Sequence, residues 1–250
     1  YGAFGQGKGA GIFAHATGTI DGNTYTGLAG YALLTTGVFQ QRKGVYGLTE
    51  GGLGNPTDYT ASIASILLDS AGDVGTYNSV AIGSDGFPVM SYWDGTSSGL
   101  KVAKCGNASC SSGNTLATVS SDPPAASGIG TSLAIGSDGF PIVSYYGENG
   151  WLKVAKCGNA ACTSGNTIST VDNSGNVGGF SSMKIGTDNF PVISYYDASN
   201  TGLKVAKCGN ISCSAGNTIT PVDTVGSVGS HTSLAIGSDG FPVISYRNID

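Results

Sequence analysis

The chain has 250 residues, of which 42 are glycine, 40% are hydrophobic and only 11% are charged. This length allows one or two domains, and the hydrophobic content predicts a folded chain rather than a disordered one. The formal net charge of -5 argues against a nucleic-acid partner. No apolar run approaches the roughly 18 residues needed for membrane insertion. Because the chain begins with Tyr1 rather than Met, we expect a processed form or a fragment of a longer protein.

The first 54 residues differ in kind from the rest. They are rich in glycine, and Thr19–Tyr25 predicts a hairpin around Asp-Gly-Asn. Short apolar phrases such as Gly44–Gly47 resemble the Gly-Val-Tyr-Gly stretches in the shafts of trimeric phage tail fibres. The alternative is a glycine-rich cap or linker. Because such a segment buries little apolar surface alone, we expect residues 1–54 to order against other copies of the chain.

The remainder of the chain, residues 55–250, is dominated by an internal repeat of about 51 residues. Four nearly identical segments mark the starts of the repeats, at Ser79–Pro88, Ser132–Pro141, Ser182–Pro191 and Ser233–Pro242. We therefore divide this region into repeats covering 79–131, 132–181, 182–232 and 233–250.

Each full repeat predicts four short strands. The Ser-Asp-Gly turn after the first strand favours the positive φ of a tight hairpin, and proline then opens the second strand. The second strand, such as Pro191–Tyr196, is apolar on both faces, the third carries lysines, and the fourth is rich in Thr, Ser and Val. This decline in hydrophobicity from inner to outer strands is typical of a blade of an all-β fold, the β-propeller.

The repeat also resembles known proteins. Asp-Gly-Phe-Pro-Val-Ile-Ser-Tyr and Leu-Lys-Val-Ala-Lys-Cys resemble the propeller-type repeats of secreted and surface proteins of bacteria and their phages. For function, this resemblance implies only display or binding outside the cell.

The last repeat reaches only two strands by Asp250. Ile63–Asp69 and the residues after it match the fourth strand of a repeat, and Gly44–Glu50 could supply the third. We therefore expect residues 60–75 to close the blade that begins at Ser233, which would give four blades and leave no open sheet edge. The alternative is a longer chain with further blades.

Six cysteines form three closely spaced pairs, at Cys105 and Cys110, Cys157 and Cys162, and Cys208 and Cys213. Pairing within each repeat is the simplest connectivity, whereas two ligands in each repeat would make poor zinc sites. We therefore predict three disulfides and a location that is extracellular, on a cell surface or on a virion surface.

Catalysis finds little support in the sequence. Sialidase-like chemistry uses three arginines, and the chain has two, Arg42 and Arg247. A two-carboxylate glycosidase could use Asp94, Glu148 and Asp197, although all three also suit hairpin turns. The single repeated turn aspartate falls short of a calcium site. We therefore expect no enzyme, no catalytic residue, no metal and no cofactor.

The ends of the second strands offer the best candidate for ligand binding. Aromatic or polar residues recur there, and we take six of them as the candidate site: Trp93, Asp94, Tyr146, Tyr196, Asp197 and Arg247. Exposed rings beside carboxylates suit sugars, whereas packing between blades is the alternative.

These observations favour a binding or adhesion module of a fibre or surface appendage, with cell-surface glycans as the expected ligands. The alternatives are a purely structural subunit of an extracellular filament and, third, a glycoside hydrolase.

Overall fold

The computed structural model describes residues 14–20, 23–29, 45–50, 63–121 and 130–248, and the chain divides into two compact units, Tyr1–Gln41 and Arg42–Asp250. In the first unit, β1 (Ala14–Ile20) and β2 (Asn23–Ala29) form an antiparallel hairpin in which Ile20 lies opposite Asn23. The hairpin predicted around Asp-Gly-Asn is confirmed.

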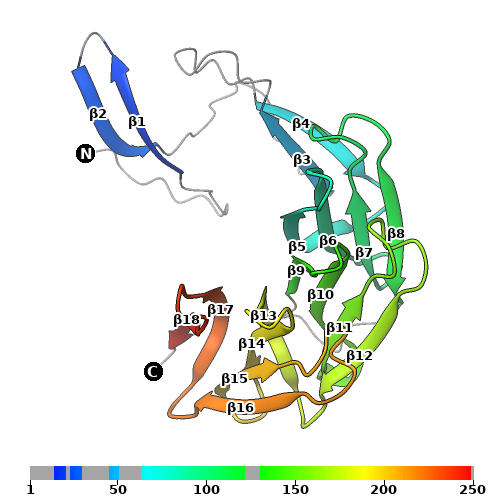
Figure 1. The fold of residues 1–250 in the computed structure, drawn as a ribbon, viewed down its shortest axis with the longest axis vertical. Coiled ribbons are helices and arrows are strands. Elements are labelled where there is room, and N and C mark those ends of the chain that lie inside the picture. The colour runs from blue at the N-terminus through cyan, green and yellow to red at the C-terminus, as the bar shows by residue number, and fades with distance from the viewer. Residues whose placement is uncertain (1–13, 21–22, 30–44, 51–62, 122–129, 249–250) are drawn as a thin grey trace. The chain divides into compact units, whose positions relative to one another are not determined.

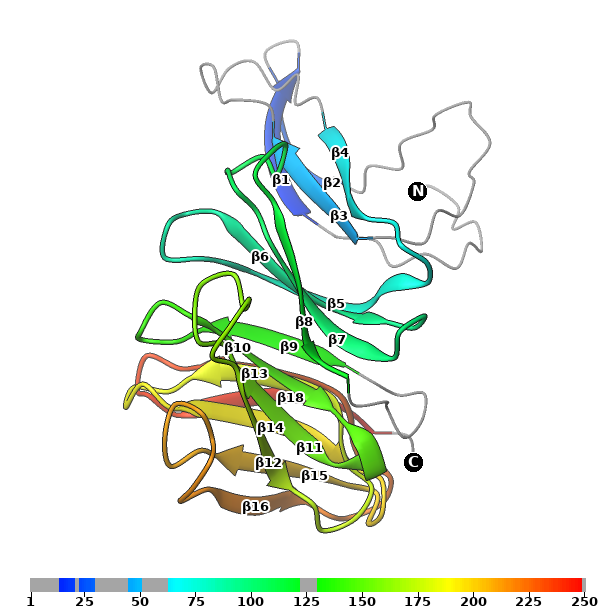
Figure 2. The ribbon, with the colours of Figure 1, turned by 90° about the vertical axis from the view of Figure 1, so that its right-hand side faces the viewer.

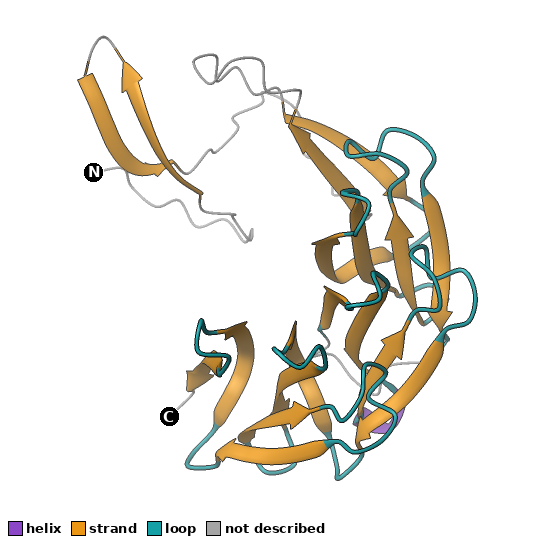
Figure 3. Ribbon diagram, viewed as in Figure 1, coloured by secondary structure: helices purple, strands orange, loops and turns teal. Residues whose placement is uncertain are grey.

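The second unit is built from antiparallel sheets (Figure 1 and Figure 3). Three sheets have four strands each, and in each of them the strands are neighbours in chain order. The first contains β5 (Val74–Ile82), β6 (Pro88–Asp94), β7 (Gly99–Lys104) and β8 (Thr115–Ser120). The second contains β9 (Thr131–Ile135), β10 (Pro141–Tyr146), β11 (Leu152–Lys156) and β12 (Thr167–Asp172), with a short 3-10 turn, η1 (Glu148–Gly150). The third contains β13 (Val177–Ile185), β14 (Pro191–Asp197), β15 (Gly202–Lys207) and β16 (Thr218–Asp223).

Two further pairs of strands belong to this unit. β17 (Val228–Ile236) pairs with β18 (Pro242–Asn248), and β3 (Val45–Glu50) pairs with β4 (Ile63–Asp69). The unit begins at Arg42, ahead of the boundary expected at residue 54, and so includes β3. The two pairs are separate two-stranded sheets, so the closing role expected for residues 60–75 stays a prediction. We predict that residues 1–54 contact other copies of the chain. Most of these residues lie outside the described part of the structure.

The predicted Asp-Gly turn has the same geometry in each repeat. In the first blade, the Gly83 amide donates to the Phe87 carbonyl at 2.9 Å, and the Asp85 carboxylate accepts from the Phe87 amide at 3.0 Å. Gly86 has a φ of 80°, which glycine adopts without steric cost. In the third blade Asn189 takes this position with a φ of 67°, as asparagine tolerates better than most residues.

Serine links each blade to the next. The Ser79 hydroxyl accepts a hydrogen bond from the Leu133 amide at 3.1 Å, Ser132 accepts from Met183 at 2.9 Å, and Ser182 accepts from Leu234 at 3.0 Å. The first strands β5, β9, β13 and β17 therefore lie in series, with the fourth strands on the opposite side of the unit (Figure 1 and Figure 2). Four-stranded sheets that stack through their faces in this way form a β-propeller fold.

The core lies between successive sheets. The second strands supply its largest side chains, and Tyr92, Tyr145 and Tyr195 are fully buried. All six cysteines form disulfides within their own repeats, as predicted, at Cys105–Cys110, Cys157–Cys162 and Cys208–Cys213. In the described part of the chain, no helix has the length and hydropathy of a membrane span.

Candidate functional site

The predicted aromatic residues lie mostly inside the molecule. The side chains of Trp93 and Tyr146 are each only 5% exposed, and Tyr196 is half-buried. Trp93 belongs to the same apolar cluster as Tyr145 of the next blade. The expectation of exposed rings at these strand ends is corrected for Trp93 and Tyr146, because Trp93 packs against the next blade and the Tyr146 hydroxyl donates to Asn176 at 2.6 Å.

The predicted carboxylates are held in ion pairs. Lys101 lies 3.2 Å from Asp94 in its own blade and 2.8 Å from Asp69 at the end of β4. Asp69 also accepts a hydrogen bond from the Tyr92 hydroxyl at 2.8 Å. Asp94 also accepts hydrogen bonds from the Thr96 and Ser97 amides. These four side chains, Asp69, Tyr92, Asp94 and Lys101, form a junction between two blades, which we name the Lys101 junction.

The same arrangement recurs in the third blade. Lys204 lies 2.8 Å from Asp197 and 3.4 Å from Asp172, and the Tyr195 hydroxyl donates to Asp172 at 2.6 Å. We name Asp172, Tyr195, Asp197 and Lys204 the Lys204 junction. A pocket of about 100 Å³ beside Asp197 and Lys204 is small for a sugar ring, and both of its charged groups are already paired.

Electrostatics keeps these carboxylates ionised. Burial alone would raise the pKa of Asp94, but hydrogen bonds from Ser97 and the charge of Lys101 outweigh it and lower the pKa to about 2. For Asp172, burial is likewise outweighed, here by the hydrogen bonds from Tyr195 and Ser174 and the charge of Lys204, so its pKa is lowered. A carboxyl group whose pKa is lowered stays ionised near neutral pH and is a poor proton donor there.

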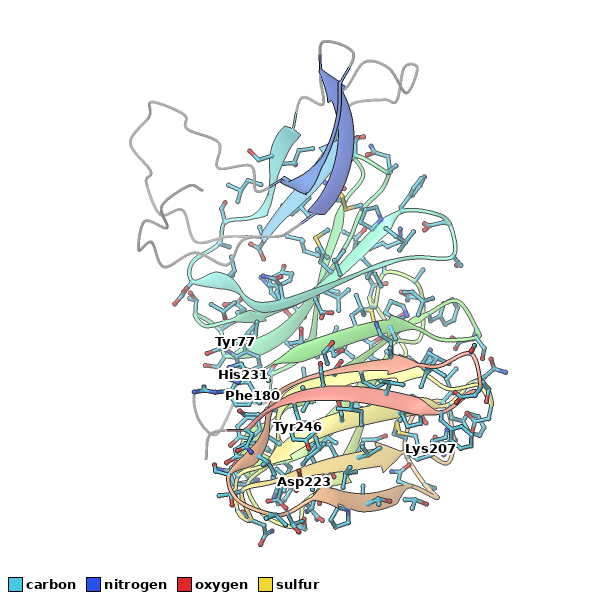
Figure 4. All side chains as sticks on the ribbon, turned by 90° about the vertical axis from the view of Figure 1, so that its left-hand side faces the viewer. Tyr77, Phe180, Lys207, Asp223, His231 and Tyr246 are labelled. Carbon is cyan, nitrogen blue, oxygen red and sulfur yellow. A yellow bond between two sulfur atoms is a disulfide. The ribbon has the colours of Figure 1, made fainter. Side chains whose placement is uncertain are left out.

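A different set of rings is partly exposed. Tyr77, Phe180 and His231 lie on the first strands β5, β13 and β17, each two residues before the serine that begins a repeat. Tyr77 is 41% exposed, His231 is exposed and Phe180 is half-buried. The Phe180 and His231 rings stack with centroids 4.2 Å apart, and Figure 4 shows Tyr77 on the same side of the unit. We name Tyr77, Phe180 and His231 the inner row.

The backbone of the inner row is strained. Its residues have φ values of 54°, 53° and 54°, a region that bulky side chains rarely adopt. Each lies in a β-bulge, where the first strand shifts register against the second. The next blade holds this conformation in place, because the Tyr77 carbonyl accepts from Thr131 at 2.7 Å and the Phe180 carbonyl accepts from Thr232 at 2.9 Å. Residues kept in such conformations cluster at ligand sites.

Polar groups flank one end of the inner row. Ser230 precedes His231, and its buried hydroxyl has no hydrogen-bond partner among the described residues. Arg247, an exposed member of the predicted site, lies opposite Ser230 in the β17–β18 register. Of the predicted residues, Trp93, Tyr196 and Arg247 each lie opposite the residue that precedes a member of the inner row, and the Tyr196 ring centroid lies 6.4 Å from that of Phe180.

Our sequence reasoning did not identify the inner row. The repeats carry Tyr77, Gly130, Phe180 and His231 at this position, while the residues after it are nearly constant. A position that varies within otherwise uniform repeats is the signal that could have identified the row.

Comparison with known proteins gives only distant structural matches. No family model and no curated protein matches the sequence. A protein of unknown function from Dyadobacter fermentans matches 62% of this chain at 13% identity and a TM-score of 0.46, and the chain covers 44% of its length. An alpha-L-arabinanase from Cellvibrio cellulosa matches 92% of this chain at 11% identity and a TM-score of 0.36, with 76% of its own length covered. A GH43 endo-arabinanase from Bacillus licheniformis matches 73% at 17% identity and a TM-score of 0.33, with 61% covered.

These matches correct one expectation. Our sequence analysis set enzymes aside, but two of the matched structures are arabinanases, so an enzymatic role is no longer set aside. At these identities and TM-scores, the similarity does not transfer their activity to this chain. None of the matches supports the resemblance to phage tail fibres.

Proposed function

We propose that this chain is an extracellular β-propeller that binds carbohydrate through the inner row of Tyr77, Phe180 and His231. The observation that carries the proposal is the positive φ of these three residues on the first strands of three blades. A bulky side chain in this conformation costs about 1–3 kcal/mol, and glycine would avoid most of that cost. Glycine does occupy the same position in the second blade, at Gly130.

The chemistry of the row suits a sugar. Partly exposed aromatic faces stack on the apolar faces of sugar rings, and polar groups beside them bind hydroxyls. His231, Arg247 and the hydroxyl of Ser230 can supply such contacts. The three disulfides support an extracellular location, since they persist in oxidising compartments.

The test replaces Tyr77 with glycine, the residue that the second blade already has. We expect Tyr77→Gly to raise the free energy of unfolding by about 1 kcal/mol, because it relieves backbone strain. It should weaken glycan binding about tenfold, which corresponds to about 1.4 kcal/mol. Ile168→Ala is a matched control, since Ile168 is also 41% exposed but lies on the fourth strand β12.

Binding is measured on an array of neutral and acidic oligosaccharides, then by calorimetry on the best ligand. The same samples are assayed for release of reducing ends, which would show that the chain hydrolyses the glycan that it binds. A chain that binds no glycan would contradict the proposal and favour a structural subunit. Undiminished binding by Tyr77→Gly would show that the inner row is not the site.

A further inference from the structure

In the part of the chain that the structure describes, the edge of β18 lacks the partner that its counterparts have. Each of the second strands β6, β10 and β14 pairs on both sides, whereas β18 pairs among these residues only with β17. Side chains of β18 are also more exposed than their counterparts, which pack against a neighbouring blade. Val243 of β18 is 64% exposed, while its counterpart in β6, Val89, is 1% exposed. Tyr246 is 39% exposed, while Tyr92 at the same repeat position is fully buried. Such an edge is a template for another strand.

β3 and β4 reproduce the outer half of a blade. In the complete blades, the third and fourth strands skip one residue at a fixed point, where Leu203 lies opposite Asp223 but Lys204 lies opposite Pro221. The β3–β4 pair has the same irregularity at the same point, because Val45 lies opposite Asp69 and Tyr46 opposite Leu67. The pair therefore corresponds to third and fourth strands, not to a generic hairpin.

β4 also makes the contacts of a fourth strand. The Tyr92 hydroxyl donates to Asp69 at the end of β4, as Tyr195 donates to Asp172 at the end of β12. Gly75, the second residue of β5, has a φ of 95°, and Gly178, the second residue of β13, has a φ of 101°. β4 thus occupies the place of the fourth strand in the blade that precedes β5.

We propose that β3 of the same chain pairs with the open edge of β18 and completes a fourth blade from β17, β18, β3 and β4. The register follows from the complete blades. Because Val192 lies opposite Lys207 and Tyr195 opposite Lys204, Val243 is placed opposite Thr49 and Tyr246 opposite Tyr46. This pairing covers the exposed edge residues of β18 and removes an edge from each two-stranded sheet.

The test introduces one cysteine in each strand. Residues directly opposite in an antiparallel pair have Cβ atoms about 4.5–5.5 Å apart, within reach of a disulfide after small adjustments. We expect Val243→Cys with Thr49→Cys to form a fourth disulfide under mild oxidation, read as a loss of two thiols by alkylation and mass spectrometry. The matched control, Val243→Cys with Leu48→Cys, is one residue out of register and should keep both thiols, because side chains alternate between faces.

Every outcome bears on the proposal. A fourth disulfide within one chain, in the first variant only, supports it. A cross-linked dimer shows that β18 pairs with a second copy and overturns closure within one chain. Free thiols in both variants, or equal cross-linking in both, overturn the proposed register. Hydrogen exchange on the unsubstituted chain gives an independent measurement. Amides of β18 should be protected as well as those of β14, and rapid exchange along β18 would overturn the proposal even if the cysteine variants fail to fold.

Discussion

The Lys204 junction and its counterpart in the second blade perform the same structural task with different groups. In the Lys204 junction, two buried carboxylates bracket the lysine. In the second blade, Ser120 takes the place of Asp172 and accepts a hydrogen bond from the Tyr145 hydroxyl at 3.3 Å. Gly147 takes the place of Asp197. η1 then brings Glu148, whose side chain is 46% exposed, to 3.1 Å from Lys153. We name Ser120, Tyr145, Glu148 and Lys153 the Lys153 junction.

This difference shows what the blade requires. The apolar second strand, the linking serine and the disulfide occur in all three complete blades, whereas the buried ion pairs occur in two of them. Buried ion pairs often add little net stability over apolar alternatives, because desolvation offsets their attraction. Once present, however, they are costly to break, and the following predictions test that asymmetry.

The largest effect is expected from removing one carboxylate of the Lys204 junction. Asp172→Ala leaves the Tyr195 hydroxyl without its buried acceptor and Lys204 with Asp197 alone, and should lower the free energy of unfolding by about 2–3 kcal/mol. The control is Ser120→Ala, at the same position of the Lys153 junction. We expect this variant to lower the free energy of unfolding by about 1 kcal/mol. Both are measured by chemical denaturation, and equal losses would show that the two junctions do not differ in energy.

Acid should weaken the charged junctions next. Since the folded-state pKa of Asp94 is about 2, its contribution is fully present above about pH 4 and is lost as the pH falls toward 2. Ionisation of Asp94 alone contributes about 2 kcal/mol to the free energy of unfolding at neutral pH. The double variant Asp69→Ser with Asp94→Gly copies the Lys153 junction, and its stability should depend less on pH between 4 and 2. Parallel curves for variant and parent would assign the acid sensitivity to other groups.

The smallest effect is expected at the half-exposed ion pair. Glu148→Gln should cost less than about 1 kcal/mol, since solvent screens an exposed carboxylate. Asp197→Asn is the comparison. Because Asp197 is buried, this substitution should lower the free energy of unfolding by more than Glu148→Gln does. A midpoint of thermal unfolding for each variant gives the ranking, and a reversed order would refute the role that we assign to burial.

Much of the fold could be predicted from the sequence because its signals are local. The Asp-Gly turns, the proline at the start of each second strand and the cysteine spacing specify short-range geometry, and the structure contains all three. The site was harder to predict. The burial of Trp93 depends on packing against the next blade, and the role of Asp69 depends on a tyrosine in the next blade. Such contacts between blades leave no local pattern.

The serine links between blades have a direction. Each linking serine accepts a hydrogen bond from a backbone amide of the blade that follows it in the chain. A unit bounded by one acceptor and one donor can be duplicated or deleted in the gene without creating a mismatched contact. The near identity of the segments that start the repeats, about 51 residues apart, agrees with duplication of such units. We therefore expect the number of blades to vary among close relatives more readily than the sequence of any one blade.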